Sequence, residues 1–160
     1  MENDTITLTH QNWRKVWRLD QPVIWHRRAM TVGLLHRVLR RPDQVVLNLD
    51  ASGLALEGGE EFDYSPGVTL SWLMYPFSLD ALVGNTFRIP NAYDSTVKDH
   101  VATFCYYEHN DMNDVAVKFL ERVGNSFAIE VTGTADSPDA NEPAGTIQVS
   151  IKCVVRHTDR

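Results

Sequence analysis

The sequence contains few of the features that mark specialised classes of protein. Only two cysteines are present, Cys105 and Cys153, and they show no CxxC spacing, so buried, reduced thiols are expected. The longest nearly apolar run, WLMYPF at residues 72–77, is far too short to cross a bilayer. The opening MENDTITLTH has no basic region ahead of an apolar core, so no secretory signal is expected. These absences predict a cytoplasmic protein without a membrane segment.

Motifs for catalysis are also scarce. The histidines are scattered without an HxH or HExxH pattern, and the chain has no GxSxG motif, phosphate-binding glycine loop or dinucleotide fingerprint. Cys105 falls on a predicted apolar row, which favours an inert core thiol over a nucleophile. The sequence therefore predicts no cofactor and favours a non-enzymatic protein. The alternative is a small hydrolase or ligand-processing enzyme, which would need a deep pocket in the sheet lined by converging His, Asp or Glu side chains.

What the chain does contain is typical of a globular domain. It has 160 residues, of which 43% are apolar and 22% charged, and this fits one domain over residues 1–160. The net charge of −6 is unevenly distributed, since residues 1–45 hold eight Lys or Arg against four Asp or Glu, and the remainder holds seven against seventeen. Opposite charges on two parts of one chain can steer a partner or pair reciprocally in a dimer.

The basic N-terminal segment raises the question of nucleic-acid binding. Arginines lie among Trp13, Trp17 and Trp25, and such a mixture can contact phosphates and stack on bases. However, the tryptophans have the spacing of a buried core, and the whole chain is acidic. Because nonspecific affinity depends on neutralising phosphate charge, nucleic acid is not the expected partner.

Residues 1–42 are predicted to be helical. Three apolar residues of THQNWRKVWRLDQP have helical i, i+3, i+4 spacing: Trp13, Val16 and Trp17. A second stripe with helical spacing runs from Met30 to Leu39. The second segment also alternates like a strand, and Gly33 disfavours a helix, so both structures remain open for residues 26–41. We thus predict one or two N-terminal helices.

From residue 43 onward the period changes to two, as expected for strands. The clearest example is TIQVSIKCVVR, whose apolar side carries five residues: Ile147, Val149, Ile151, Cys153 and Val155. Similar runs occupy residues 100–109, 114–123 and 126–134. Together with the helical segment, these strands predict an α+β domain dominated by antiparallel sheet over 43–160, either a sandwich or a partly open barrel.

A register for the strands between residues 101 and 134 follows from keeping apolar rows together. The best match has a three-residue loop at Gly124–Ser126 and another at Asn110–Met112. It also leaves three apolar residues on the opposite face: Phe104, Tyr106 and Leu120. Because such side chains are rarely left bare in a monomer, we expect the N-terminal helices or another copy of the chain to cover them.

These observations predict a binding or interaction domain that self-associates as a homodimer or other homo-oligomer. In this interpretation the three apolar residues supply the buried contact. Acidic loops such as Glu60–Asp63 meet four arginines of the partner: Arg27, Arg28, Arg40 and Arg41. A different protein or a small molecule is the alternative partner.

The stretch CYYEHNDMNDVAV is rich in potential metal ligands. The predicted register sets Glu108 opposite Asp114, with Asp111 in the loop between them, and a cation such as calcium or magnesium would relieve the repulsion. However, the stretch lacks the ligand spacing of a calcium loop, and Asn and Asp cap such turns without any ligand. The sequence therefore predicts no metal, with these three carboxylates as the candidates if one binds.

One short segment resembles a known family. Arg37-x-x-x-Arg41 followed by LDASG is similar to the RxxxR and DxSxxG motifs of the PilZ cyclic-di-GMP receptors, which are β-barrels. Asp50 and Ser52 match the second motif, but Ala55 stands at its final glycine position, and the gap of eight residues between the motifs is short. The resemblance covers fewer than twenty residues. It implies a barrel that binds a cyclic dinucleotide, but with these departures it assigns no site residue.

Overall fold

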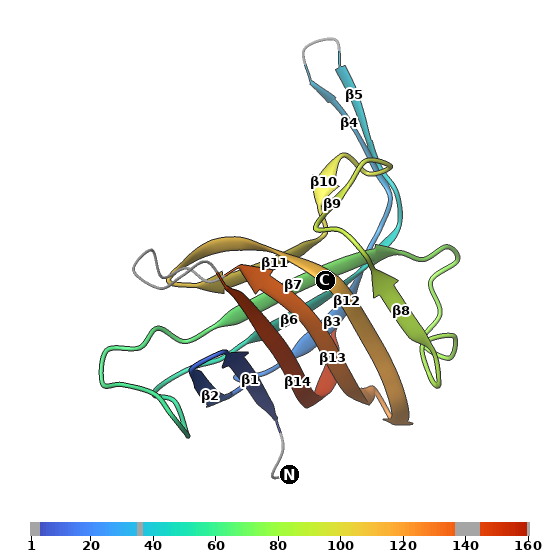
Figure 1. Cartoon of the computed structure of the whole chain (residues 1–160). Coiled ribbons are helices and arrows are strands. Elements are labelled where there is room, and N and C mark those ends of the chain that lie inside the picture. Colours follow the sequence, from blue (N-terminus) through green and yellow to red (C-terminus); the bar gives the residue numbers. More distant parts are fainter. Residues whose placement is uncertain (1–3, 35–36, 137–144, 160) are drawn as a thin grey trace.

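The computed structural model describes residues 4–34, 37–136 and 145–159, with the backbone alone over 30–34 and 37–41. The described residues form strands and connecting loops and contain no helix (Figure 1). Accordingly, no helix in this part of the chain could span a membrane. The strands are β1 (Thr5–His10), β2 (Trp13–Arg18), β3 (Val23–Arg27), β4 (Met30–Leu34), β5 (Arg37–Arg41), β6 (Gln44–Asp50), β7 (Gly67–Leu73), β8 (Thr86–Ile89), β9 (Tyr93–Asp94), β10 (Asp99–His100), β11 (Ala102–Tyr106), β12 (Glu108–Val123), β13 (Ser126–Asp136) and β14 (Thr146–His157).

Seven strands close into a barrel in the order β13-β12-β11-β7-β6-β3-β14, because β14 also pairs with β13 (Figure 1). All of these pairs are antiparallel except the short parallel contact between β14 and β3. The hairpin of β1 and β2 extends the sheet beyond β14. A closed barrel leaves no open edge among its seven strands, which removes a common route to aggregation.

Alternating burial along each strand fills the barrel with apolar side chains. In β14 every second residue from Ile147 to Val155 is buried, as the sequence pattern predicts. The largest buried side chains come from distant parts of the chain: Trp17, Phe104, Phe119 and Phe127. The last two meet edge to face with ring centroids 5.7 Å apart.

The prediction of an α+β domain with N-terminal helices is wrong. Residues 13–18 form strand β2, paired with β1, and Ile6 lies opposite Trp17. The spacing of Val16 and Trp17 looked helical because both faces of β2 are covered. Trp17 packs into the core, while Val16 exchanges backbone hydrogen bonds with the loop at Leu56 and Glu57. A strand buried on both faces loses its period of two, so periodicity alone cannot separate it from a helix.

Strand and helix were both open for residues 30–41; residues 30–34 and 37–41 form the paired strands β4 and β5, which we call the arm. Its strands pair with each other alone, in a two-stranded sheet separate from the barrel sheet. The register sets Val32 opposite Leu39 and Gly33 opposite Val38. Figure 1 shows the arm rising away from the barrel wall.

The predicted register between residues 101 and 134 is also wrong. The turn between β11 and β12 lies at Tyr107, whose φ is +63°, rather than at Asn110–Met112. The next turn is the two-residue loop Gly124–Asn125. In β12 two irregularities, one between Asn113 and Ala116 and one between Phe119 and Arg122, keep the apolar row facing inward.

Gly133 makes the first of these irregularities possible. A Cβ at this position would collide with the end of the Met112 side chain and would lie 3.1 Å from a methyl group of Val115. The bulged part of β12 therefore packs directly on the bare backbone of β13. Beyond this irregularity β12 remains paired with β13 and has β8 in place of β11 on its other side.

Candidate functional site

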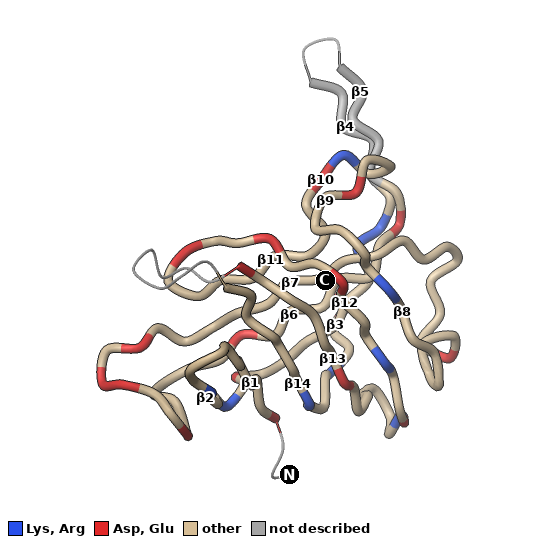
Figure 2. Tube along the Cα trace, in the orientation of Figure 1, with Lys and Arg blue, Asp and Glu red and all other residues tan. Residues whose placement is uncertain are grey.

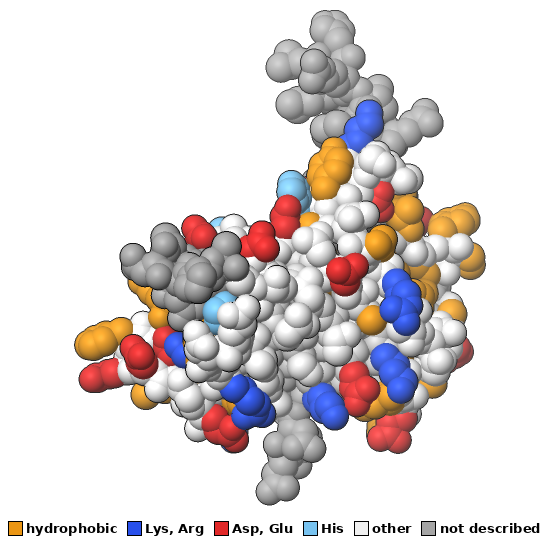
Figure 3. Space-filling model, viewed as in Figure 1, with side chains coloured by type: hydrophobic (Ala, Val, Ile, Leu, Met, Phe, Trp, Pro, Cys, Tyr) orange, Lys and Arg blue, Asp and Glu red, His pale blue; other side chains and the backbone are white. Residues whose placement is uncertain are grey.

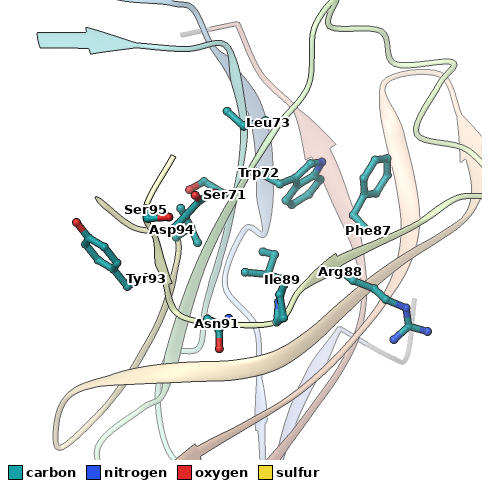
Figure 4. A pocket seen from close by; sticks show the side chains of 12 residues that line it. Ser71, Trp72, Leu73, Phe87, Arg88, Ile89, Asn91, Tyr93, Asp94 and Ser95 are labelled. Atoms are coloured by element: carbon teal, nitrogen blue, oxygen red, sulfur yellow. The ribbon is translucent and has the colours of Figure 1, made fainter. Parts of the chain in front are cut away.

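A cavity of about 450 Å³ opens in the barrel wall between β7 and β8, and we call it the slot (Figure 4). It is lined by the end of β7, by β8, by part of the following loop and by Val101: Ser71, Trp72, Leu73, Phe87, Arg88, Ile89, Pro90, Asn91, Tyr93, Asp94, Ser95 and Val101. Its size lies within the range of small-molecule sites in proteins.

The slot exists because two strands, β11 and β8, pair in succession with the same side of β12. Along its first part β12 pairs with β11, and β11 also pairs with β7 up to Leu70. Further along, β12 pairs instead with β8, which has no other strand partner. The last residues of β7 therefore have β6 on one side and the slot on the other.

An aromatic wall forms one side of the slot. The ring of Trp72 stacks on that of Phe87 at a centroid distance of 5.2 Å, and its other contact is an edge-to-face pair with Phe119 at 6.2 Å. Trp72 is 8% exposed, and its indole N–H has no hydrogen-bond partner among the described residues. A buried donor without a partner costs free energy, so a ligand acceptor or a water molecule placed there would be stabilised.

Polar side chains also line the slot, on the other face of β7 from Trp72. In Figure 4 Ser71, Asp94 and Ser95 lie close together, while the guanidinium group of Arg88 points away from the cavity. One carboxylate oxygen of Asp94 accepts a hydrogen bond from the Thr96 amide at 2.7 Å. This contact fixes the side chain and leaves its other oxygen without a bond to the described residues.

A series of polar groups connects the slot to residues 26–29 and 42–44, which join the arm to the barrel and which we call the neck. Gln44 donates to the Ser71 hydroxyl at 3.5 Å and accepts from the guanidinium of Arg27. Beside it, Asp43 contacts His26 Nε2 at 2.7 Å and accepts from the amide of Ala29 at 3.2 Å. Asp43 thus joins the two strands of the neck where they leave the barrel.

A second polar cluster, the loop anchor, lies at the side of the barrel where residues 51–66 cover β2. Lys15 Nζ lies 2.9 Å from both carboxylate oxygens of Asp63 and 3.4 Å from the Tyr106 hydroxyl. Tyr107 donates to Asp63 at 2.7 Å, and the Glu60 amide donates to it at the same distance. The Lys15 and Asp63 side chains are only 14% and 3% exposed, so this ion pair is shielded from solvent.

The surroundings of this cluster lower the pKa of Asp63 and raise that of Tyr106. Burial opposes ionisation of Asp63, but the hydrogen bonds from the Glu60 amide, Lys15 and Tyr107 outweigh it and lower its pKa. Burial, followed by the nearby Asp63 charge, raises the pKa of Tyr106 well above its usual value. The cluster therefore favours an ionised Asp63 beside neutral tyrosines, an arrangement that binds the loop to the barrel and leaves no group poised for proton transfer near neutral pH.

The structure places the three predicted apolar contact residues apart. Phe104 is fully buried and Tyr106 is 3% exposed, because the turn at Tyr107 points both of them into the barrel. Leu120 is 41% exposed on the outer face of β12. Cys105 is exposed, against the prediction of a core thiol, whereas Cys153 is buried as expected and burial raises its pKa.

The four predicted arginines lie between the end of β3 and the end of β5. Arg27, at the end of β3, is engaged by Gln44, and Arg28 is exposed next to it. Arg40 and Arg41 belong to β5, where the register sets them opposite Thr31 and Met30. All four therefore lie in the arm or at its neck.

The carboxylates considered as metal ligands do not converge. Glu108 and Asp114 lie on the same strand, six residues apart, which is about 20 Å at the rise of a β-strand. Asp111 instead pairs with His100 Nδ1 at 3.0 Å. Within the described ranges, no group of three or more His, Cys, Asp or Glu side chains could hold a metal ion.

The structure also separates the two motifs that resemble PilZ. Arg37 and Arg41 are on β5 in the arm, whereas Asp50 ends β6, whose seven residues span about 20 Å. The barrel agrees with the resemblance, but the motifs do not form a common site within one copy. In three comparisons with known proteins, no family model, no curated sequence and no solved structure matches the chain.

Proposed function

We propose that this protein is a non-enzymatic binding domain whose ligand site is the slot. The observation that carries the proposal is the lining of the slot, which combines a stacked Trp72–Phe87 pair with a carboxylate and two serine hydroxyls around one cavity. This arrangement suits a small molecule with a flat apolar body and a cationic or hydrogen-bond-donating group at one end.

The preference for a positive charge comes from Asp94. It is the one carboxylate among the described residues that line the slot, and the guanidinium of Arg88 is directed outward. The aromatic wall adds to this preference, since the face of a Trp or Phe ring attracts cations. A ligand amine would therefore find favourable interactions with both the carboxylate and the rings.

The lining supports binding over catalysis. Its twelve described residues include serines but no histidine or cysteine, so neither Ser71 nor Ser95 has the adjacent base that activates a nucleophile. The pocket expected for a hydrolase would lie inside the sheet, where apolar side chains fill the described core. The free thiols of Cys105 and Cys153 support the cytoplasm as its compartment.

The test is a titration of ¹⁵N-labelled protein with 2-phenylethylamine and, separately, with its neutral analogue 2-phenylethanol. We expect the amine to shift the indole N–H resonance of Trp72 and the amides of β8, with a dissociation constant on the order of 1 mM, as is usual for fragments of this size. Asp94→Asn keeps the acceptor for the Thr96 amide, so it isolates the charge. It is expected to weaken the amine about tenfold and leave the alcohol unchanged.

Asp20→Asn is the matched control, because Asp20 is exposed and does not line the slot. It should bind both compounds as the unmodified protein does. If neither compound shifts resonances of the slot, or if the shifts spread over unrelated surface residues, the slot is not a ligand site.

A further inference from the structure

The arm and the residues that lead into it form the most strongly basic part of the chain. Residues 21–42 hold five arginines and no Asp or Glu, whereas the rest of the chain holds ten Lys or Arg against 21 Asp or Glu, a balance of −11. The arm strands also carry apolar residues: Met30, Val32, Leu34, Val38 and Leu39. Since a two-stranded ribbon without other partners is only marginally stable in water, a basic and apolar ribbon of this kind calls for a partner surface.

A surface of complementary composition lies on residues 51–66, which we call the acidic loop. Figure 2 shows acidic residues and no basic ones along it: Glu57, Glu60, Glu61 and Asp63. It also exposes large apolar side chains, since Leu54 is 66%, Phe62 85% and Tyr64 64% accessible. Orange and red side chains lie side by side at its tip in Figure 3. Exposed apolar groups with a charged rim are typical of interaction sites.

The acidic loop is held in place before any partner arrives. The loop anchor joins Asp63 to Lys15, and backbone hydrogen bonds join Leu56 and Glu57 to Val16. Ser65 closes the base of the loop through a bond to the Gly53 carbonyl at 2.9 Å. A contact made by a preorganised loop loses less conformational entropy on binding.

We propose that two copies of this chain associate through the arm of one copy and the acidic loop of the other. Figure 1 shows the arm and the acidic loop at opposite ends of the molecule, so the arm cannot reach the loop of its own copy. A two-fold dimer with the molecules side by side in opposite directions makes the contact twice and closes on itself. This proposal does not depend on the slot.

Sedimentation velocity over about 1 to 100 µM protein tests the association, at about 50 mM and about 500 mM NaCl. We expect a dimer at low salt, with a dissociation constant that rises at least tenfold at high salt because the contact pairs arginines with carboxylates. The pair Arg40→Glu and Arg41→Glu in the arm, and the pair Glu60→Lys and Glu61→Lys in the loop, should each give a monomer. The chain that carries all four changes should dimerise again, because the charges are exchanged.

Arg156→Glu, an exposed reversal on β14, is the matched control and should leave the dimer unchanged. Phe62→Ser should weaken the dimer without changing the thermal unfolding temperature measured on dilute protein at high salt, where both chains are monomeric, since Phe62 is exposed. A strict monomer for the unmodified protein at the highest concentration would overturn the proposal. So would a dimer that the arm and loop variants leave intact, or arm arginines that prove necessary only for DNA binding in low-salt gels.

Discussion

Replacing Lys15 by Met should destabilise the folded protein by about 3 kcal/mol. Lys15 Nζ is the only side-chain cation within bonding distance of Asp63 among the described residues, and it also lies 5.2 Å from the centroid of the Trp13 ring; Met retains most of the apolar stem but loses both contacts of the ammonium group. The change therefore removes a charge with little loss of packing. It leaves the Asp63 carboxylate, which is 3% exposed, with the Tyr107 hydroxyl and the Glu60 amide, each at 2.7 Å, as donors.

The magnitude follows from that burial. Removing one partner of a buried ion pair typically costs about 3 to 5 kcal/mol, and the two remaining donors to Asp63 place this case at the lower end. For a domain of this size, the corresponding fall in the unfolding temperature is about 6 to 12 °C. The part of the acidic loop around Asp63 should be released first, because the bonds of Leu56 and Glu57 to Val16 hold its other part on β2.

Urea unfolding followed by tryptophan fluorescence is the appropriate assay, because Trp13 and Trp17 lie beside the anchor. The double variant Lys15→Met with Asp63→Asn should lose much less than the sum of its single variants, because it buries no uncompensated charge. A loss below about 1 kcal/mol for Lys15→Met, the value of an exposed ion pair, would refute the reasoning. So would strict additivity of the two changes.

Two further predictions concern pH and packing. Burial raises the pKa of Tyr106 in the folded protein above its value near 10 in the unfolded chain. The free energy of unfolding should therefore be unaffected by this group below pH 10 and should fall above it, by up to about 1.4 kcal/mol per pH unit. Alkaline urea titrations should show this slope in the unmodified protein and a shallower one in Tyr106→Phe, and equal slopes would contradict it. Gly133→Val should cost about 1 to 3 kcal/mol by overpacking against Met112, and an unchanged unfolding temperature would show that β12 can relax.

The sequence predicted correctly the strands that have one solvent-exposed face. The alternation of β14 is clear because its outer row is polar, and the apolar row of β12 from Val115 to Phe119 is buried as predicted. It was a poor guide where both faces of a strand are covered, as in β2. There the loop over Val16 and the core around Trp17 together produced an apolar spacing that resembles a helix.

The error in β11 has a different cause. A tight turn at a non-glycine residue with positive φ, Tyr107, has no strong sequence signal, so the turn was placed in the Asn- and Asp-rich stretch three residues later. A shift of this kind inverted the faces of β11 and turned Phe104 and Tyr106 outward in the prediction. Of the three residues expected on an apolar outer surface, Leu120 alone is exposed.

The slot could not be predicted from the sequence at all. Its aromatic wall joins Trp72 and Phe87, from strands that do not pair with each other, and its carboxylate, Asp94, belongs to the two-residue strand β9, which has no recognisable motif. Only the topology, with β8 and β11 sharing one flank of β12, brings them together. The run WLMYPF indicates that the end of β7 is buried, but it does not indicate that one side of this strand borders a cavity.

Because β12 pairs first with β11 and then with β8, the width of the slot depends on the backbone of β12 at this change of partner, around Asp114. The amide of Asp114, which has a φ of +52°, donates to the Pro90 carbonyl at 3.0 Å, just where the strand changes partner from β11 to β8. A guest that spreads β8 from β7 would strain this hydrogen bond, because it joins the loop after β8 to β12. Hydrogen exchange of that single amide would then report how far the wall yields, even for compounds that never touch Asp114.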